Sequence, residues 1–295
     1  MQKFATIFLG IFISAAPFML IGTLVSGFIE HFISKDQLKR FIPGKGIAAA
    51  ASGVLLGLIF PVCECGVVPV TRRLIRKGVS ISTAISFMLA APVMNPVVIA
   101  STWAAFGFGR ILLWRILLGG CIACLVGLIF NLSRPEEVML GSEVELPQCA
   151  LGEQPERDLT VLFNHTLMMA GYEFFEMGRY LVVGSLLAAS MQAIIPQAAI
   201  LAIGQGPISS VVVMLALAFA LCVCSTVDAF VALGFAANFT TASILAFLVF
   251  GAMVDLKSTI MFLGVFKRRI VIYLIVLPLQ LVFLLAVFAN LNLGL

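Results

Sequence analysis

Apolar runs long enough to cross a lipid bilayer recur along the whole chain. A helix needs roughly 20 apolar residues to span a hydrocarbon core of about 30 Å. Hydrophobic residues fill 62% of the 295 positions and charged residues only 11%, far from the composition of soluble domains. The sequence therefore predicts an all-α polytopic membrane protein without room for a soluble catalytic domain, and so not an enzyme. The expected membrane helices are 4–30, 80–105, 110–131, 160–190, 240–264 and 270–291.

The formal net charge of +4 is interpreted through topology. In a polytopic protein, Lys and Arg mainly mark the loops that face the cytoplasm, so this charge does not predict a nucleic-acid partner. The first apolar run continues to Phe28 without a small-residue cleavage site, which predicts a retained helix rather than a removed signal peptide. The expected partner along the whole chain is the lipid bilayer.

Each half also holds an apolar piece with unusual proportions. The sequence is apolar from Ile47 to Val62, CECG follows, and only five residues then precede the basic stretch that starts at Arg72. A re-entrant hairpin turning at CECG fits these lengths, because non-helical backbone is tolerated in a membrane where protein or a cavity surrounds it. The matching piece in the second half is 207–230. Eight or more full crossings are the alternative.

A shift of 159 residues superimposes the two halves. It places Cys63 on Cys222 and Cys65 on Cys224, at equivalent positions of the hydropathy pattern. We therefore predict two membrane repeats, 1–132 and 159–295, each with three transmembrane helices and one re-entrant hairpin. The stretch 133–158 between them is acidic and rich in Pro and Gly, which predicts a flexible cytoplasmic linker.

Loop charge predicts that the two repeats have inverted topology. The first-half loops 28–46 and 71–79 carry four basic residues each, whereas their counterparts 189–206 and 231–239 carry none. Positively charged loops stay on the cytoplasmic side. Equivalent loops of the two halves are therefore expected on opposite sides of the membrane, with the N-terminus outside.

Two closely spaced cysteines in each half form the first candidate site. Residues i and i+2 of a regular helix point about 200° apart, so Cys63 and Cys65 can face one ligand only where the helix is interrupted. Pro61, Gly66 and Pro69 predict that interruption, and the two sulfurs could then converge on a soft atom. Alternatively, these cysteines are small residues at close-packed turns. The candidate substrate-binding residues are Cys63, Cys65, Gly66, Asn95, Cys222 and Cys224.

The stretch APVMNP at 91–96 is the second candidate. Pro92 and Pro96 bracket Asn95, which predicts freed backbone carbonyls and a polar amide at membrane depth. Together with Pro61 and Pro69, these prolines are the predicted helix breaks.

Carboxylates within the membrane are functional candidates by default. Glu64, Asp228 and Asp255 are therefore expected to carry coupling protons. Lys257 follows Asp255 by two residues and suggests that Asp255 lies near an interface.

Glu173, Glu176 and Arg179 share one face of a predicted helix. The two glutamates are further candidates for proton coupling, and an ion pair between Glu176 and Arg179 is the structural alternative. His31 and His165 lack the spacing of a zinc motif. No metal or cofactor is expected.

CECG, the basic loop after it and SFMLAAPVMNPVV together resemble the predicted permease family that includes the ArsP-type organoarsenical efflux permeases. The resemblance covers nearly the whole chain. It implies a multi-pass permease of the bacterial inner membrane, and some family members export trivalent organoarsenicals such as methylarsenite. The positions that match the family motif are Pro61, Cys63, Cys65, Gly66, Pro92, Asn95, Pro96, Cys222 and Cys224.

Two functions are therefore weighed. The first is a secondary transporter with a midmembrane site between the repeats, which predicts proton-coupled flux of a small or soft-metalloid solute. The second is a membrane thiol–disulfide electron carrier with a thioredoxin-like partner, which predicts reversible cysteine oxidation. A disulfide spanning one intervening residue would be strained, which favours transport. Both functions are compatible with a homo-oligomer.

Overall fold

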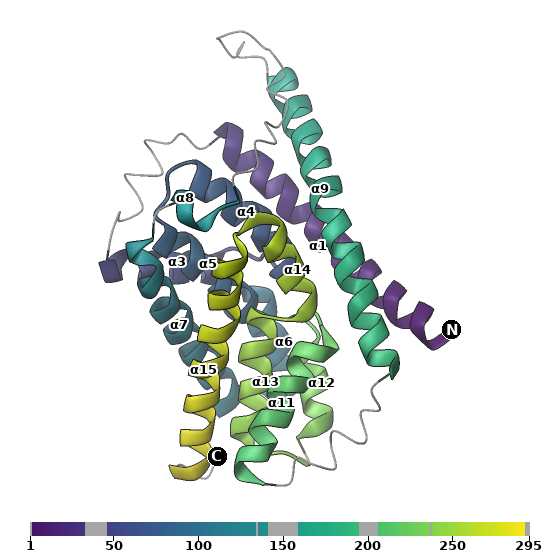
Figure 1. Cartoon of the computed structure of the whole chain (residues 1–295), viewed down its shortest axis with the longest axis vertical. Helices are drawn as coiled ribbons and strands as arrows, with labels where there is room; N and C mark the ends of the chain where they lie inside the picture. The colour runs from purple at the N-terminus through teal and green to yellow at the C-terminus, as the bar shows by residue number, and fades with distance from the viewer. Residues whose placement is uncertain are drawn as a thin grey trace.

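The computed structural model of the chain is a bundle of helices (Figure 1). It describes residues 2–32, 46–133, 135–140, 159–194, 206–236 and 238–292. Within these ranges, all regular structure is helical apart from one isolated β-bridge between Met139 and Phe266. The predicted linker 133–158 lies mostly outside the described residues.

In each half, the described residues begin with a helix of more than 30 residues, and shorter helices follow it. The first half has α1 (Gln2–Phe32), α3 (Gly46–Ile59), α4 (Glu64–Arg76), α5 (Ile81–Met94), α6 (Pro96–Phe106) and α7 (Arg110–Ile129), followed by the short η1 (Phe130–Leu132) and α8 (Pro135–Val138). The second half has α9 (Leu159–Ile194), α11 (Pro207–Leu221), α12 (Asp228–Phe235), α13 (Thr241–Met253), α14 (Leu256–Val265) and α15 (Arg268–Asn292).

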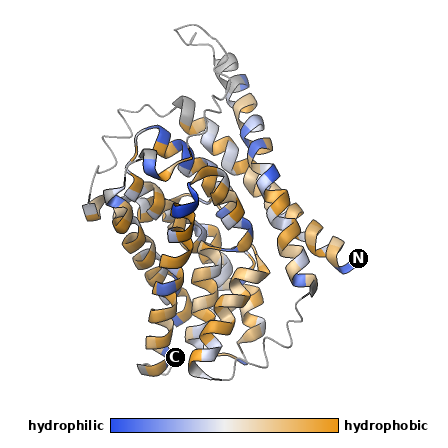
Figure 2. Ribbon diagram, in the orientation of Figure 1, coloured by the Kyte–Doolittle hydropathy of each residue, from blue (hydrophilic) through white to orange (hydrophobic). Residues whose placement is uncertain are grey.

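Five stretches of the described chain are long and apolar enough to cross a membrane, and hydrophobic residues dominate the bundle (Figure 2). They confirm an all-α membrane protein. The predicted span 160–190 is α9, an unbroken helix of 36 residues that carries charged side chains in its middle. The five apolar stretches are Gln2–Ile29, Ile81–Phe106, Arg110–Ile129, Thr241–Val265 and Arg268–Leu291.

The helices of the two halves pack into one bundle. α5 packs against α3 and α7, and α13 packs against α11 and α15. Contacts of α13 with α5 and α7, and of α12 with α6, join the two sets. α9 packs along α1 and α14 at one side of the bundle (Figure 1). At the helix breaks described below, Asn95, Ser225 and Asp255 are buried, whereas Pro61 and Pro96 are exposed.

Two of the apolar stretches are broken in the middle. α5 gives way to α6 at Asn95, whose side chain accepts a hydrogen bond from the Val98 N–H, and Pro96 follows at the first helical position. Such a cap and an N1 proline start a new helix locally. α13 gives way to α14 at Asp255, which forms a capping box with Ser258.

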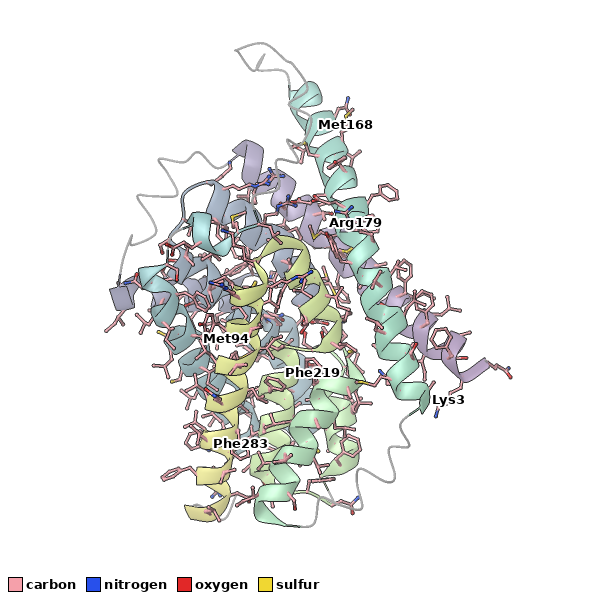
Figure 3. The ribbon with its side chains drawn as sticks, in the orientation of Figure 1. Lys3, Met94, Met168, Arg179, Phe219 and Phe283 are labelled. Carbon is pink, nitrogen blue, oxygen red and sulfur yellow. The ribbon has the colours of Figure 1, made fainter. Side chains whose placement is uncertain are left out.

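The chain is also non-helical between the short helices of each half. Residues 60–63 separate α3 from α4, and residues 222–227 separate α11 from α12. Cys222 has a φ of 48°, a left-handed conformation that ends α11. Figure 3 places Met94, the last residue of α5, and Phe219, near the end of α11, in the middle of the bundle.

The predicted breaks at Pro69 and Pro92 do not fall on those residues. Pro69 lies inside α4 and Pro92 inside α5, and both helices continue through them. Pro61 and Pro96 do flank breaks. The chain leaves its helical path where caps and free backbone groups find partners, and a proline alone does not determine that position.

Candidate functional site

The four helix breaks meet through contacts within the first half and between the two halves. The Ser225 hydroxyl, in the break after α11, donates to Glu64 Oε2 at 3.1 Å. Lys257 Nζ, near the start of α14, lies 3.0 Å from Glu64 Oε1. Asn95 Nδ2 donates to the Val62 carbonyl at 3.2 Å, which joins the break after α5 to the break after α3. These breaks therefore surround one central cluster of polar side chains.

One part of this cluster is the lysine triad, which consists of Glu64, Asp255 and Lys257. The three residues are 3%, 1% and 1% exposed. Lys257 Nζ also lies 3.8 Å from Asp255 Oδ2, so the ammonium stands between a carboxylate of the first half and one of the second. Lys257 and Asp255 are thus both buried inside the bundle, and the expectation that Asp255 lies near a membrane interface stays a prediction.

The other part is the arginine pair, Arg115 with Asp228. The guanidinium of Arg115, in the second turn of α7, donates to both oxygens of Asp228 at 2.9 and 2.6 Å. It also donates to the Thr102 hydroxyl at 3.0 Å and the Val93 carbonyl at 3.2 Å. Bidentate, charge-assisted bonds of this kind are the strong ones. The pair joins α7 of the first half to α12 of the second.

All three acids of the cluster stand at the start of a helix. Glu64 and Asp228 are the first residues of α4 and α12, and Asp255 caps α14. The N-terminal end of a helix carries a partial positive charge that favours nearby carboxylates. The helix breaks therefore create the environment in which these buried acids are accommodated.

The predicted cysteines lie around the lysine triad. Cys63 is the extended N-cap residue of α4 and Cys65 lies in the first turn of that helix, so the helical path is interrupted beside the two cysteines. The Cys222 sulfur faces the backbone N–H groups of Leu256 and Lys257. The four sulfurs of the two CxC motifs are free thiols, and only Cys224 is partly exposed.

The remaining substrate-binding candidates serve packing or capping. A Cβ on Gly22 of α1 would overlap the Gly66 backbone, so Gly66 allows α1 and α4 to cross closely. Asn95 Oδ1 accepts a hydrogen bond from the Val98 N–H, and Asn95 Nδ2 donates one to the Val62 carbonyl. The structure places both residues beside the cluster, with structural contacts that account for them.

Glu173 and Glu176 lie in a separate charged group between α9 and α4. Glu176 Oε2 accepts from Arg72 at 2.8 Å, and Glu173 Oε1 lies 3.8 Å from Arg73. Arg179 lies over the ring of Tyr180, 4.9 Å from its centroid. The structure thus divides the five predicted acids into three of the central cluster and two of this α4–α9 group.

Sequence reasoning missed Arg115 and Lys257 as members of the site. Arg115 interrupts a strongly apolar helix, and an ionisable residue at such a position is itself a signal of function. The partner of each base lies more than a hundred residues away in the sequence. The sequence therefore shows that Arg115 is unusual, but it does not show with which residues Arg115 and Lys257 pair.

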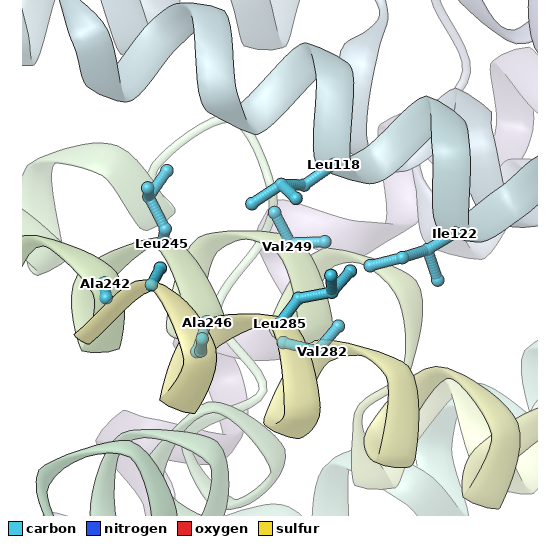
Figure 4. A pocket seen from close by; sticks show the side chains of 10 residues that line it. Leu118, Ile122, Ala242, Leu245, Ala246, Val249, Val282 and Leu285 are labelled. Carbon is cyan, nitrogen blue, oxygen red and sulfur yellow. The ribbon is translucent and has the colours of Figure 1, made fainter. Parts of the chain in front are cut away.

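Two pockets of the bundle lie away from the central cluster. One is a small apolar pocket between α7, α13 and α15, lined by Leu118, Ile122, Val249 and Leu285 among others (Figure 4). The other, of about 520 Å³, lies between α11, α13 and α15. Neither lining includes a residue of the lysine triad or the arginine pair. With side chains 1–4% exposed, the central cluster is closed to solvent in this conformation.

Apolar spanning helices, broken at a buried charged centre, define a polytopic membrane protein of the transport class. The chain belongs to a family described as "Predicted permease", whose match covers residues 1–291. It is therefore a permease-type multi-pass protein of the bacterial membrane.

Relatives with known names agree with this family. The chain is 41% identical over 273 residues to the UPF0718 protein YcgR of Bacillus subtilis, covering 92% of this chain and 91% of the relative. It is 36% identical over 267 residues to a putative two-component membrane permease complex subunit of Streptococcus mutans, covering 90% and 88%. No solved structure matches the chain at a significant level.

Proposed function

We propose that this permease is a secondary transporter whose solute crosses at the central cluster, between two inverted repeats. The observation that carries the proposal is the meeting of four helix breaks, two from each half, at buried charges that include two ion pairs across the halves, Arg115–Asp228 and Lys257–Glu64. Discontinuous helices at a repeat interface are the usual construction of a secondary-transport site. Rocking of one half against the other would expose this cluster to each side in turn.

The helix lengths support one re-entrant hairpin in each repeat. α3 and α11 have 14 and 15 residues, fewer than the roughly 20 needed to cross. The two ends of the α3–α4 piece are each bonded near the C-terminal end of a long helix. The Gly46 N–H, at the start of α3, donates to Asn131 after α7, and Lys77, just after α4, donates to the Ile29 carbonyl of α1. We accordingly assign 1–132 and 159–295 as the repeats and 133–158 as their linker.

A thiophilic solute, for example a trivalent organoarsenical, is the substrate class that we propose. Soft atoms prefer thiolate ligands, and two pairs of free thiols flank the lysine triad. Binding of such an atom releases thiol protons, for which the neighbouring carboxylates are acceptors. The buried acids are therefore also proposed to couple transport to protons.

The test is efflux of methylarsenite from loaded proteoliposomes. Cys63→Ser/Cys65→Ser should abolish flux, because both sulfurs at the start of α4 are removed. Cys121→Ser/Cys124→Ser is the matched control, since these two thiols lie on α7 outside the cluster and Cys121 is exposed. Unchanged flux in the first variant would reject thiol binding while leaving the transporter.

The same vesicles distinguish the alternative of an electron carrier. That function requires reversible oxidation of the cysteines with a thioredoxin-like partner. Reversible oxidation of the thiols without any solute flux would reject the function as a transporter and support the function as an electron carrier. The name of the streptococcal relative also motivates a search for a partner subunit or a second copy by copurification from the native membrane.

A further inference from the structure

The lysine triad has an unbalanced charge. Glu64 and Asp255 are two carboxylates, and Lys257 is the single ammonium between them. The arginine pair is neutral by itself and supplies no compensating charge. An uncompensated charge in a site this deeply buried costs several kcal/mol. One of the two carboxylates therefore has a strong reason to hold a proton in this conformation.

The hydrogen bonds identify which oxygen is available for that proton. Glu64 Oε1 accepts from Lys257 and Oε2 accepts from Ser225. Asp255 Oδ1 accepts the N–H of Ser258 as the helix cap. Asp255 Oδ2 is buried without a hydrogen-bond partner, at 3.8 Å from the ammonium. Both oxygens of Glu64 are thus satisfied as a carboxylate, and Asp255 Oδ2 is not.

We infer that a single proton on Asp255 Oδ2 couples the transport cycle, and that Lys257 changes partner when this proton leaves. The inference rests on the proposed function as a secondary transporter. With the proton bound, the ammonium pairs with Glu64 and ties α14 of the second half to α4 of the first. When the proton passes to water on the open side, Asp255 becomes charged and attracts the ammonium. Glu64 then keeps only Ser225, and the tie between α14 and α4 is released.

Few groups near Lys257 can take part in this change of ion-pair partner. Glu64 and Cys65 face it from α4, and Cys224 faces it from the break after α11. From α9, Gly184 packs against the Lys257 backbone, and the Tyr180 ring of that helix lies at the other end of α14, against Gly264. The basic residues that begin α15 also follow that far end. Among the described residues, Glu64 and Asp255 are the acids with which Lys257 pairs.

The first test requires no substrate. Infrared spectra of the purified protein in detergent at neutral pH should contain the absorption of a protonated carboxyl group. Glu173 Oε2 is also buried without a hydrogen-bond partner, so the measured quantity is the intensity of the band. Asp255→Asn should lower this intensity, and asparagine retains the ability to cap α14. Glu137→Gln, at an exposed position in α8, is the control and should keep the full intensity. An unchanged intensity in Asp255→Asn would overturn the inference.

A second variant protects the test against misfolding of the first. Lys257→Met removes the ammonium and leaves two buried carboxylates, so the protonated band should increase. An unchanged band in Lys257→Met would also overturn the assignment.

Flux then tests the coupling itself. In proteoliposomes loaded with methylarsenite, we compare efflux with and without an imposed pH gradient. The stimulation by the gradient should be present in the wild type and in Glu137→Gln, and should be lost in Asp255→Asn. Stimulation that survives in Asp255→Asn, or that requires a sodium gradient instead, would overturn proton coupling at this residue. Absence of any methylarsenite flux in the wild type would reject the proposed substrate, while the infrared result would still decide where the proton resides.

Discussion

The arginine pair and the lysine triad join the same two halves in different ways. Arg115 holds Asp228 through two short bonds and fills its other donors with Thr102 and Val93. Lys257 holds Glu64 at 3.0 Å and leaves Asp255 at 3.8 Å. The pair is closed and neutral, whereas the triad has one acid too many and one oxygen unbonded. The difference suggests that the pair fixes the halves in register and that the triad is the part that changes during transport.

Breaking the arginine pair should have the largest effect on stability. Arg115→Leu leaves Asp228 buried without its partner, and we expect a loss of about 3 to 5 kcal/mol in the free energy of unfolding. The measurement is SDS denaturation of the purified protein, followed by circular dichroism. The double variant Arg115→Leu/Asp228→Leu should recover most of the loss. Equal stabilities of the single and double variants would show that the ion pair is not the cause.

Removing the base of the triad should have a smaller effect that depends on pH. Lys257→Met is expected to lose about 2 to 3 kcal/mol at neutral pH, because Glu64 loses its ammonium partner and must take up a second proton in a buried site. Acidification protonates the second carboxylate and removes the remaining buried charge, so the loss should shrink as the pH falls. The same denaturation series at several pH values measures this. A loss of unfolding free energy that does not depend on pH would show that the triad does not differ from the arginine pair in this respect.

The charged group between α4 and α9 should be the least sensitive of the three. Arg72→Gln is expected to lose about 1 kcal/mol, because Arg73 and Arg76 still lie near Glu176 or its neighbour Glu173. Its methylarsenite efflux should retain the response to a pH gradient. Loss of that response in Arg72→Gln would extend the coupling machinery beyond the central cluster.

The sequence allowed the membrane class, five apolar spans and the family to be predicted, because long apolar runs and local motifs carry that information. It also singled out Asn95 and Asp255, at the points where α5 and α13 end. It did not show that Lys257 is buried, since a base beside an acid in an apolar stretch is equally compatible with an interface. The partners of Arg115 and Lys257 could not be predicted, because each depends on how distant helices pack.

The partners of the acidic side chains could not be predicted either, for a related reason. The sequence around Glu173 and Glu176 is apolar, as it is around Glu64. Their partners are nevertheless the arginines of α4. Pro69 likewise resembles a helix breaker but lies within α4. Local chemistry identifies which residues are unusual, and the packing of the bundle decides what each of them contacts.

The contact of residues 138–140 with the corner between α14 and α15 has a consequence for how the chain is held together. The Leu140 N–H donates to the Val265 carbonyl, and the Lys267 N–H donates to the Val138 carbonyl, both at 3.0 Å. Residues 138–140, inside the assigned linker 133–158, thus already pair with the second half. A protease cut or a new pair of termini placed after Leu140 would keep both of these hydrogen bonds. We therefore expect the two fragments to assemble as a split protein when they are coexpressed.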